Sequence, residues 1–269
     1  MHSEPSSQDQ AQARYREALA ADWRIPPGAR ILEIACGQGD MSAVLARAVG
    51  PDGHVTGVDI ASPEYGAPLT LGEATALIKA GPLGDRLTFR FQTDLLDDAV
   101  TFPDEAFDAV VLAHGAWYFS GLDQLRATLR RVRSWAPVLH IAEWDLEPTA
   151  LAQVPHLVAV LLQGMIEGYQ PNSEANVRTP FSRQQLRHLL AETGWEITHA
   201  FRPDTSTLAD GAWEVDLALH DSLPTVADMP VPDAVRDQLH AQGDILRGLA
   251  TLPVIGTLPS YALSVRRSG

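Results

Sequence analysis

The 269-residue chain has a single cysteine and no long apolar segment, and both absences limit what the protein can be. With Cys36 as the only thiol, no disulfide can form within the chain, which is compatible with a reducing compartment. The longest apolar stretch, residues 157–166, is far shorter than the roughly 20 residues of a membrane helix. Residues 1–10 lack the basic segment and apolar run of a signal peptide. We therefore expect a soluble, cytoplasmic protein that does not contact membranes.

Basic residues are also scarce. The chain has 20 Lys and Arg against 34 Asp and Glu, a formal net charge of −14. Nucleic-acid phosphates would repel so acidic a surface, so we expect no nucleic-acid partner. Since 45% of the residues are hydrophobic, the chain can bury one substantial core, and residues 1–269 are expected to form a single domain. The sequence does not specify the oligomeric state.

Short apolar runs alternate with helical segments along the chain. Strands are expected at residues 31–34, 54–60, 86–94, 107–113, 137–145, 195–202 and 260–267. Helices are expected at residues 11–23, 41–50, 71–81, 122–135, 150–169 and 182–194. Asp40 is expected to cap the second of these helices. Strands and helices at this spacing form right-handed βαβ units. The pattern predicts an α/β fold with a doubly wound, mostly parallel seven-stranded sheet in a three-layer αβα sandwich.

The expected organisation has six segments. Residues 1–28 form an N-terminal helical lid, and residues 29–146 form the ligand-binding core. Helical insertions over the carboxyl edge of the sheet are expected at 147–180 and 207–257, where they would close the acceptor site. Residues 181–206 and 258–269 supply the remaining sheet elements.

A glycine-containing turn follows the first expected strand. Ligands of doubly wound sheets bind at the carboxyl ends of the strands, where helix N-termini point their N–H groups outward. Gly37 and Gly39 lie there and allow close approach of the backbone to a ligand. Asp59 ends the second strand, where an acidic side chain accepts hydrogen bonds from ribose hydroxyls. These features also suit NAD(P), so an NAD(P)-dependent oxidoreductase is an alternative.

The position of the third glycine in a dinucleotide-binding turn argues against that alternative. Here it is Ser42, whereas a glycine would let helix and strand pack closely over a pyrophosphate. Glu33 and Asp40 flank the turn. Two carboxylates sit badly beside phosphates and suit a cationic ligand that carries an amine.

The segment EIACGQG, residues 33–39, resembles the first motif of the class I S-adenosylmethionine-dependent methyltransferases, (E/D)-x-(G/A)-x-G-x-G. The resemblance continues through VTGVDI, QTDLLDD and FDAVVLAHGAWYF and covers about residues 29–145. It implies a Rossmann-like enzyme of the small-molecule type that uses S-adenosylmethionine and releases S-adenosylhomocysteine. A non-catalytic S-adenosylmethionine-binding protein remains a further alternative.

The resemblance also implies which residues bind the cofactor. Gly37 and Gly39 would face the methionine part, and Asp59 would hold the ribose. Asp94 and the Leu95 amide would hold the adenine, and the backbone near Ala113 and His114 would receive the amino group. In related small-molecule enzymes an arginine of the N-terminal helix binds the cofactor carboxylate, which points to Arg14, although a solvated helix face is an equal interpretation. The remaining expected cofactor residues are Glu33, Ala35 and Ile60.

The acceptor chemistry requires little from the protein because a sulfonium methyl group is already activated. The enzyme must hold the nucleophile in line and exclude water, and a base is needed only if a proton must leave. His114 is the best base candidate, with a structural or cofactor-contact role as the alternative. Glu143 would orient His114 or hold an acceptor amine, and Tyr118 is the third catalytic candidate.

Aromatic and polar side chains near the strand ends and in the insertions are candidates for binding the acceptor. They are Tyr15, Tyr65, Trp117, Trp144, Tyr169, Asn176, Arg178 and Trp213. Trp117 and Tyr118 would stack on a flat acceptor or surround a cation, and core packing is the alternative for both. A metal site would need clustered acidic ligands, which we do not expect around Glu143 and Asp145, so we expect no metal. The predicted reaction is transfer of a methyl group to an N, O or C nucleophile of a small molecule, with aromatic metabolites as one candidate class.

Overall fold

The computed structural model describes residues 6–170, 173 and 175–268. Residues 1–5 of the expected N-terminal lid, residues 171, 172 and 174 of the first expected insertion, and residue 269 lie outside the described residues. The strands are β1 (Arg30–Ile34), β2 (His54–Val58), β3 (Leu87–Arg90), β4 (Ala109–Ala113), β5 (Val138–Trp144), β6 (Trp195–Phe201) and β7 (Ser260–Arg267). They form one sheet in the order β3-β2-β1-β4-β5-β7-β6.

The sheet is parallel except at β7, which is antiparallel to both β5 and β6. Ile31, Leu32, Val110 and Val111 are fully buried, because helices cover both faces of the central strands. Such strands read as continuous apolar runs, which is why the sequence reveals them. The strand order reverses between β1 and β4, and this switch point is where a doubly wound sheet binds its ligand. The predicted doubly wound, mostly parallel seven-stranded sheet is confirmed.

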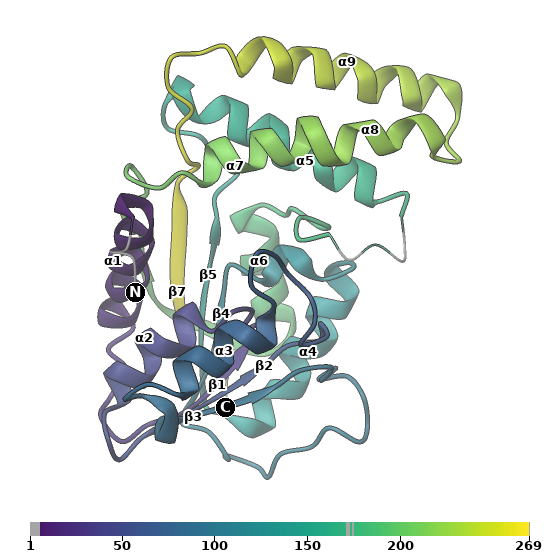
Figure 1. The fold of residues 1–269 in the computed structure, drawn as a ribbon. Coiled ribbons are helices and arrows are strands. Elements are labelled where there is room, and N and C mark those ends of the chain that lie inside the picture. Colours follow the sequence, from purple (N-terminus) through teal and green to yellow (C-terminus); the bar gives the residue numbers. More distant parts are fainter. Residues whose placement is uncertain (1–5, 171–172, 174, 269) are drawn as a thin grey trace.

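Helices lie on both sides of the sheet (Figure 1). One face carries α1 (Ser7–Asp22), α2 (Asp40–Val49) and α3 (Leu71–Lys79), with the 3-10 turn η1 (Gly84–Arg86) leading into β3. The other face carries α4 (Leu122–Trp135) and α6 (Arg183–Glu192), and η2 (Ala116–Tyr118) follows β4 directly. The three-layer αβα arrangement is therefore as predicted. Residues 91–108, all of which the structure describes, connect β3 to β4 without a helix.

Three predicted boundaries need correction. Helix α1 begins at Ser7 and not at residue 11, because Ser6 and Asp9 form a reciprocal capping box. Asp40 does not cap α2: Gly39 is the N-cap residue, and Asp40 is the first helical residue, 3.4 Å from Arg16. Strand β3 ends at Arg90 and not at residue 94, since Gln92 has a φ of 50° and turns the chain.

A helical layer, which we call the cap, lies over the carboxyl edge of the sheet (Figure 1). It consists of η3 (Leu151–Gln153), α5 (Val154–Glu167), α7 (Asp210–Leu217), the π-helical turn η4 (Ala218–Ser222), α8 (Leu223–Thr225), η5 (Val226–Asp228) and α9 (Asp233–Leu249). Helix α5 packs against α7 and α9, and these helices share an apolar cluster separate from the main core. Among the described residues, none of the helices combines the length and apolarity needed to cross a membrane.

The segment before β7 joins the cap to the sheet. The Thr257 hydroxyl donates a hydrogen bond to the Leu208 carbonyl (2.8 Å) and accepts one from the Gly211 N–H (3.1 Å). A Cβ at Gly211 would lie 2.4 Å from the Gly256 carbonyl oxygen, so this helix start fits only a glycine. The Leu258 N–H donates to Nδ1 of the buried His156 in α5 (2.9 Å). The start of α7 and the body of α5 are thus fixed to the same three residues.

We expect Thr257→Val to weaken this junction. The side chain keeps its shape, but the buried Leu208 carbonyl and Gly211 N–H each lose a hydrogen-bond partner, which costs about 1 to 3 kcal/mol. Urea denaturation should show this loss in the free energy of unfolding. The exposed Thr251, whose hydroxyl donates to the Gly248 carbonyl within one turn, provides the matched variant Thr251→Val, which should change stability by about 0.5 kcal/mol or less. Equal stability of the two variants would contradict the role of Thr257.

Candidate active site

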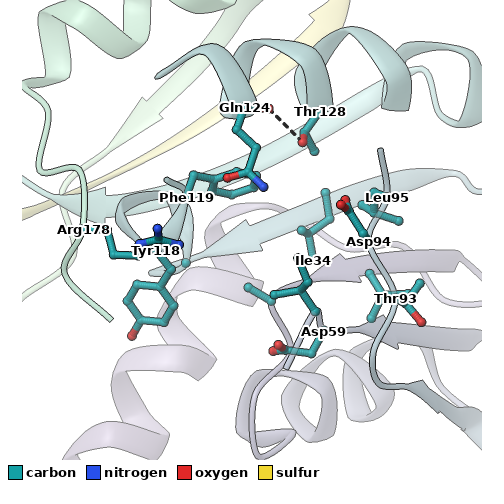
Figure 2. Close-up of a pocket in the computed structure, with 14 residues that line it drawn as sticks. Ile34, Asp59, Thr93, Asp94, Leu95, Tyr118, Phe119, Gln124, Thr128 and Arg178 are labelled. Atoms are coloured by element: carbon teal, nitrogen blue, oxygen red, sulfur yellow. Dashed lines mark hydrogen bonds between the residues drawn. The ribbon is translucent and has the colours of Figure 1, made fainter. Parts of the chain in front are cut away.

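Two cavities adjoin at the carboxyl ends of the central strands. The Asp59 cavity is lined by residues after β1, β2 and β3 and by the segment after β4 (Figure 2), namely Ile34, Ala35, Val58, Asp59, Ile60, Thr93, Asp94, Leu95, Gly115, Tyr118, Phe119, Gln124, Thr128 and Arg178. The His114 cavity adds α1 and α7, through Gln12, Tyr15, Arg16, Leu19, Glu33, Ala35, Cys36, Gly37, Gln38, Asp40, Met41, Ala113, His114, Tyr118, Trp144, Asp210 and Glu214. Ala35 and Tyr118 line both cavities, so the two form one continuous trough.

The turn after β1 has an unusual backbone. Ala35, Gly37 and Gly39 have φ values of 56°, 51° and 86°. A Cβ at Gly37 would meet no protein atom within 4 Å, so this position leaves space in the His114 cavity. A Cβ at Gly39 would lie 3.0 Å from both Ile78 and Phe89. Gly37 therefore allows a ligand to approach the backbone, whereas Gly39 allows α3 and β3 to pack against the turn.

Asp59 connects the turns after β1 and β2. Its carboxylate accepts hydrogen bonds from the Gly37 N–H and the Ala61 N–H, both at 2.9 Å. Each carboxylate oxygen retains capacity for a further hydrogen bond, as a ribose diol would require. Ile60, 61% exposed, forms part of the rim of the Asp59 cavity.

The loop after β3 forms the opposite wall. Figure 2 shows Thr93, Asp94 and Leu95 along this loop, across the cavity from Tyr118 and Arg178. Asp94 accepts a hydrogen bond from the Leu96 N–H (2.8 Å), and Leu95 is buried. The early end of β3 thus brings both predicted adenine-contacting residues into the cavity.

Acidic side chains dominate the His114 cavity. Glu33, Asp40, Asp210 and Glu214 line it, with Arg16 as the arginine among its lining residues. Such a wall favours a cationic ligand. In the part of the chain that the structure describes, no group of three or more His, Cys, Asp or Glu side chains is placed to hold a metal ion.

Glu33 is fully enclosed at the base of this cavity, and the Ser42 hydroxyl donates a hydrogen bond to its carboxylate. Burial raises the pKa of Glu33 to about 8, and the hydrogen bond from Ser42 opposes that shift in part. Ser42 therefore has a definite task at the position where a dinucleotide-binding turn has its third glycine: it solvates a buried carboxyl group.

The arginine that faces the cavity is Arg16 and not Arg14. Arg14 is exposed and does not line either cavity, while Arg16 lies 3.4 Å from Asp40. Successive helical residues are about 100° apart around the axis, so Arg14 and Arg16, two residues apart on α1, lie on nearly opposite faces. Gln12, Tyr15, Arg16 and Leu19 form the cavity face of α1 at i, i+3, i+4 and i+7. This spacing would have identified Arg16 once Tyr15 was assigned to the site.

His114 lies between α1 and β5. Its Nε2 atom is 2.6 Å from the Tyr15 hydroxyl, which is in turn 2.7 Å from the Ser260 hydroxyl. Its Nδ1 atom is 3.4 Å from a carboxylate oxygen of the buried Glu143. The Trp144 ring packs beside the imidazole, with the ring centroids 4.3 Å apart.

The remaining predicted acceptor residues divide into three groups. Tyr15, Tyr118, Trp144 and Arg178 line the trough. Trp117 is buried and packs edge-on against Phe181, so it belongs to the core, because η2 turns its side chain away from the trough. The exposed residues that do not line either cavity are Tyr65, Tyr169, Asn176 and Trp213.

The sequence predicts Trp213 and its neighbour Glu214 as lid residues and does not single out Asp210. In the structure Asp210 and Glu214 line the trough, and Trp213 does not. Asp210 and Glu214 are spaced i, i+4 on α7, so they share one helix face, and Trp213 lies about 100° away from Glu214. Their carboxylates accept hydrogen bonds from Gln12 (2.7 Å) and Gln163 (2.8 Å). The i, i+4 pattern was a usable signal, but which helix face meets the sheet depends on the tertiary structure.

Comparison with known proteins agrees with this geometry. The family described as a methyltransferase domain matches residues 31–136. The chain is 37% identical to a cyclopropane-fatty-acyl-phospholipid synthase-like protein from Lactobacillus casei, whose crystal structure superposes with a TM-score of 0.85 over 97% of this chain and 92% of that one. It is 26% identical to methyltransferase phomM of Diaporthe leptostromiformis over 89% of this chain and 72% of that protein. It is also 29% identical to a demethylmenaquinone methyltransferase of Symbiobacterium thermophilum over 44% of this chain and 43% of that protein.

The fold, the trough and these similarities identify the class of protein. The chain belongs to the class I S-adenosylmethionine-dependent methyltransferases. It is a methyltransferase, and its cofactor is S-adenosylmethionine. The space at Gly37, the hydrogen-bonded carboxylate of Asp59 and the acidic wall beside Arg16 all fit that cationic nucleoside.

Glu33 makes the stability of the ligand-free protein depend on pH. Its pKa in the folded protein, about 8, lies above its ordinary value of 4.5. Its contribution to the free energy of unfolding is therefore complete below pH 4.5 and is lost as the pH rises to 8. One such proton changes the slope of the unfolding free energy against pH by up to about 1.4 kcal/mol per pH unit. We expect Glu33→Gln to flatten the decline of unfolding free energy between pH 5 and 8. Glu196→Gln, an exposed substitution on β6, should leave the decline unchanged, and an equal slope in all three proteins would refute the assignment.

Proposed function

We propose that the protein transfers the methyl group of S-adenosylmethionine to an N, O or C nucleophile of a small molecule, which binds in the His114 cavity under the cap. The observation that carries this proposal is the continuous trough, in which Ala35 and Tyr118 line both the Asp59 cavity and the His114 cavity. A cofactor in such a trough would present its activated methyl group to the end that holds His114. The relative named as a demethylmenaquinone methyltransferase supports a small acceptor.

The residues that line the trough support one orientation of the bound cofactor. Asp59 would accept hydrogen bonds from the ribose hydroxyls, with Asp94 and Leu95 beside the adenine in the Asp59 cavity. The methionine part would lie over Gly37 in the His114 cavity, where the acidic wall suits its amine and sulfonium. Arg16, in place of Arg14, would bind the carboxylate.

The acceptor would occupy the part of the His114 cavity below α7. Trp144 and Tyr118 supply aromatic walls there, and Asp210 and Glu214 supply carboxylates. Burial raises the pKa of both Asp210 and Glu214, which supports a site that the cap shields from water. Exclusion of water favours methyl transfer to the bound acceptor over hydrolysis. Because these acceptor contacts come from the cap, we propose that the cap carries acceptor specificity.

His114 is the base in this proposal, and Glu143 positions it. The Glu143 carboxylate, 3.4 Å from Nδ1, would hold the proton on that nitrogen and stabilise the imidazolium. Nε2 would then be the basic atom on the side of Tyr15 and the cavity. Tyr118 forms a wall of both cavities, which supports a positioning role for it at the methyl group.

The ribose contact is tested by Asp59→Ala. A lost charge-assisted hydrogen bond should weaken S-adenosylhomocysteine binding by about 1.5 to 3 kcal/mol in calorimetry. Asp52→Ala, in the exposed turn before β2, should bind like the wild type. An Asp59 variant that is folded and retains wild-type affinity would exclude the ribose contact.

The role of His114 is tested by His114→Asn. His114 has a φ of 53°, and asparagine is among the residues that tolerate the left-handed region best, so this change removes the base while the backbone is retained. We expect kcat to fall by about 100-fold or more, with S-adenosylhomocysteine affinity and melting temperature nearly intact. His114→Ala should lose the same activity and also some stability. A normal kcat in His114→Asn would remove His114 from the mechanism.

A further inference from the structure

Three side chains from three separate elements form one line beside the His114 cavity. Tyr15 comes from α1, His114 from the turn after β4 and Glu143 from β5. The distance from the Tyr15 hydroxyl to Nε2 of His114 is 2.6 Å, and the distance from Nδ1 to the Glu143 carboxylate is 3.4 Å. Tyr15 and His114 both line the cavity, and Glu143 lies behind them at 1% exposure.

Backbone N–H groups hold the Glu143 carboxylate beside Nδ1 of His114. One carboxylate oxygen accepts the N–H groups of Ala116 (3.1 Å) and Trp117 (3.3 Å), and the other accepts the Trp144 N–H (3.0 Å). The second oxygen lies 3.4 Å from Nδ1, which makes no hydrogen bond to the described residues. An imidazole with its proton on Nδ1, facing this carboxylate, would accept a hydrogen bond from the Tyr15 hydroxyl at Nε2.

The consequence is that the basic nitrogen is covered. In that tautomer the Tyr15 hydroxyl, 2.6 Å away, occupies the lone pair of Nε2 that an acceptor would need. Tyr15 is itself 5% exposed, and burial raises its pKa, so the phenol keeps its proton in the resting protein. The Ser260 hydroxyl, at 2.7 Å, is then the donor to the Tyr15 oxygen.

We propose that Tyr15 relays the acceptor's proton to His114, and that the acceptor is accordingly a proton-bearing N–H or O–H nucleophile and not a carbon–carbon double bond. This inference rests on the proposed function and narrows it. As the acceptor N or O lone pair forms a bond to the methyl carbon, the S–CH3 bond breaks and its electron pair stays on sulfur. The acceptor's proton passes to the Tyr15 oxygen while the Tyr15 proton passes to Nε2. The methylated acceptor, S-adenosylhomocysteine and an imidazolium beside Glu143 result, and the proton later leaves to solvent.

A merely structural Tyr15, which docks α1 onto the sheet, is the competing explanation. Tyr15→Phe distinguishes the two because the ring and its packing remain and only the hydroxyl is lost. The matched control is Tyr261→Phe, which removes the hydroxyl of another buried tyrosine on the strand that carries Ser260, outside both cavities. Both variants should bind S-adenosylhomocysteine like the wild type in calorimetry.

The first readout needs no acceptor. Nitrogen-15 NMR of the imidazoles in the full-length protein should show wild-type His114 as the Nδ1–H tautomer, with an Nε2 resonance that shifts in Tyr15→Phe and not in Tyr261→Phe. An Nε2–H tautomer in the wild type, or an Nε2 resonance unchanged by Tyr15→Phe, would overturn the proposal.

The second readout is the formation of S-adenosylhomocysteine with tyramine and catechol, which offer N–H and O–H groups, and with oleate, which offers a carbon–carbon double bond. If the wild type methylates tyramine or catechol, Tyr15→Phe should lower kcat for that acceptor by about 100-fold. It should change the acceptor KM by less than about threefold and reduce the solvent isotope effect on kcat. Turnover of oleate, or an unchanged kcat in Tyr15→Phe, would refute the relay while leaving methyl transfer intact. Failure of the wild type to bind S-adenosylhomocysteine would instead contradict the proposed function. If none of the three probes is turned over, the NMR result decides.

Discussion

The buried carboxylate of Glu143 is the interaction on which the catalytic end of this structure depends. It binds the N–H groups of Ala116 and Trp117 after β4 and that of Trp144 at the end of β5, and it faces His114. A buried polar group is tolerated only when its hydrogen bonds are made, and here the backbone makes them. The same carboxylate fixes the turn after β4 and lies 3.4 Å from the imidazole, so the shape of the turn and the surroundings of its histidine are not independent.

Backbone strain is concentrated at this end of the sheet. Ala35 and His114, at the turns after β1 and β4, both have left-handed φ values that cost non-glycine residues of order 1 to 3 kcal/mol each. The two turns touch, since a Cβ at Gly115 would lie 2.6 Å from Cβ of Ala35. Contacts from neighbouring elements hold these conformations. The carboxylate of Asp59 binds the Gly37 N–H, and α1 closes over His114 through Tyr15. Such strain persists only where the surroundings enforce it, which supports a functional reason for both turns.

The sequence was informative wherever a residue's role follows from its own strand or turn. The sheet, the glycine turn and Asp59 could be predicted because continuous apolar runs and strand-end positions are local features. Which face of α1 and of α7 meets the trough could not be predicted, because it depends on the rotation of each helix about its axis. The trough is lined by Arg16 and not Arg14, and by Glu214 and not Trp213. That rotation is set by packing against distant elements, such as α1 on the sheet and α7 on the segment around Thr257. The hydrogen bond between Tyr15 and His114 joins residues 99 positions apart, and no local pattern predicts it.

The acidic His114 cavity has a cost in the ligand-free protein and a benefit in the complex. Glu33, Asp210 and Glu214 all have raised pKa values because burial disfavours their charged forms. A cationic ligand reverses this balance, since an opposite charge nearby favours the carboxylates and replaces the water they have lost. The unfavourable burial of these carboxyl groups thus favours a positively charged cofactor over a dinucleotide, whose phosphates would be repelled by the same carboxylates. Buried acidic side chains therefore discriminate between S-adenosylmethionine and a dinucleotide. Ser42, at the position of the third glycine of a dinucleotide-binding turn, contributes through its hydrogen bond to Glu33.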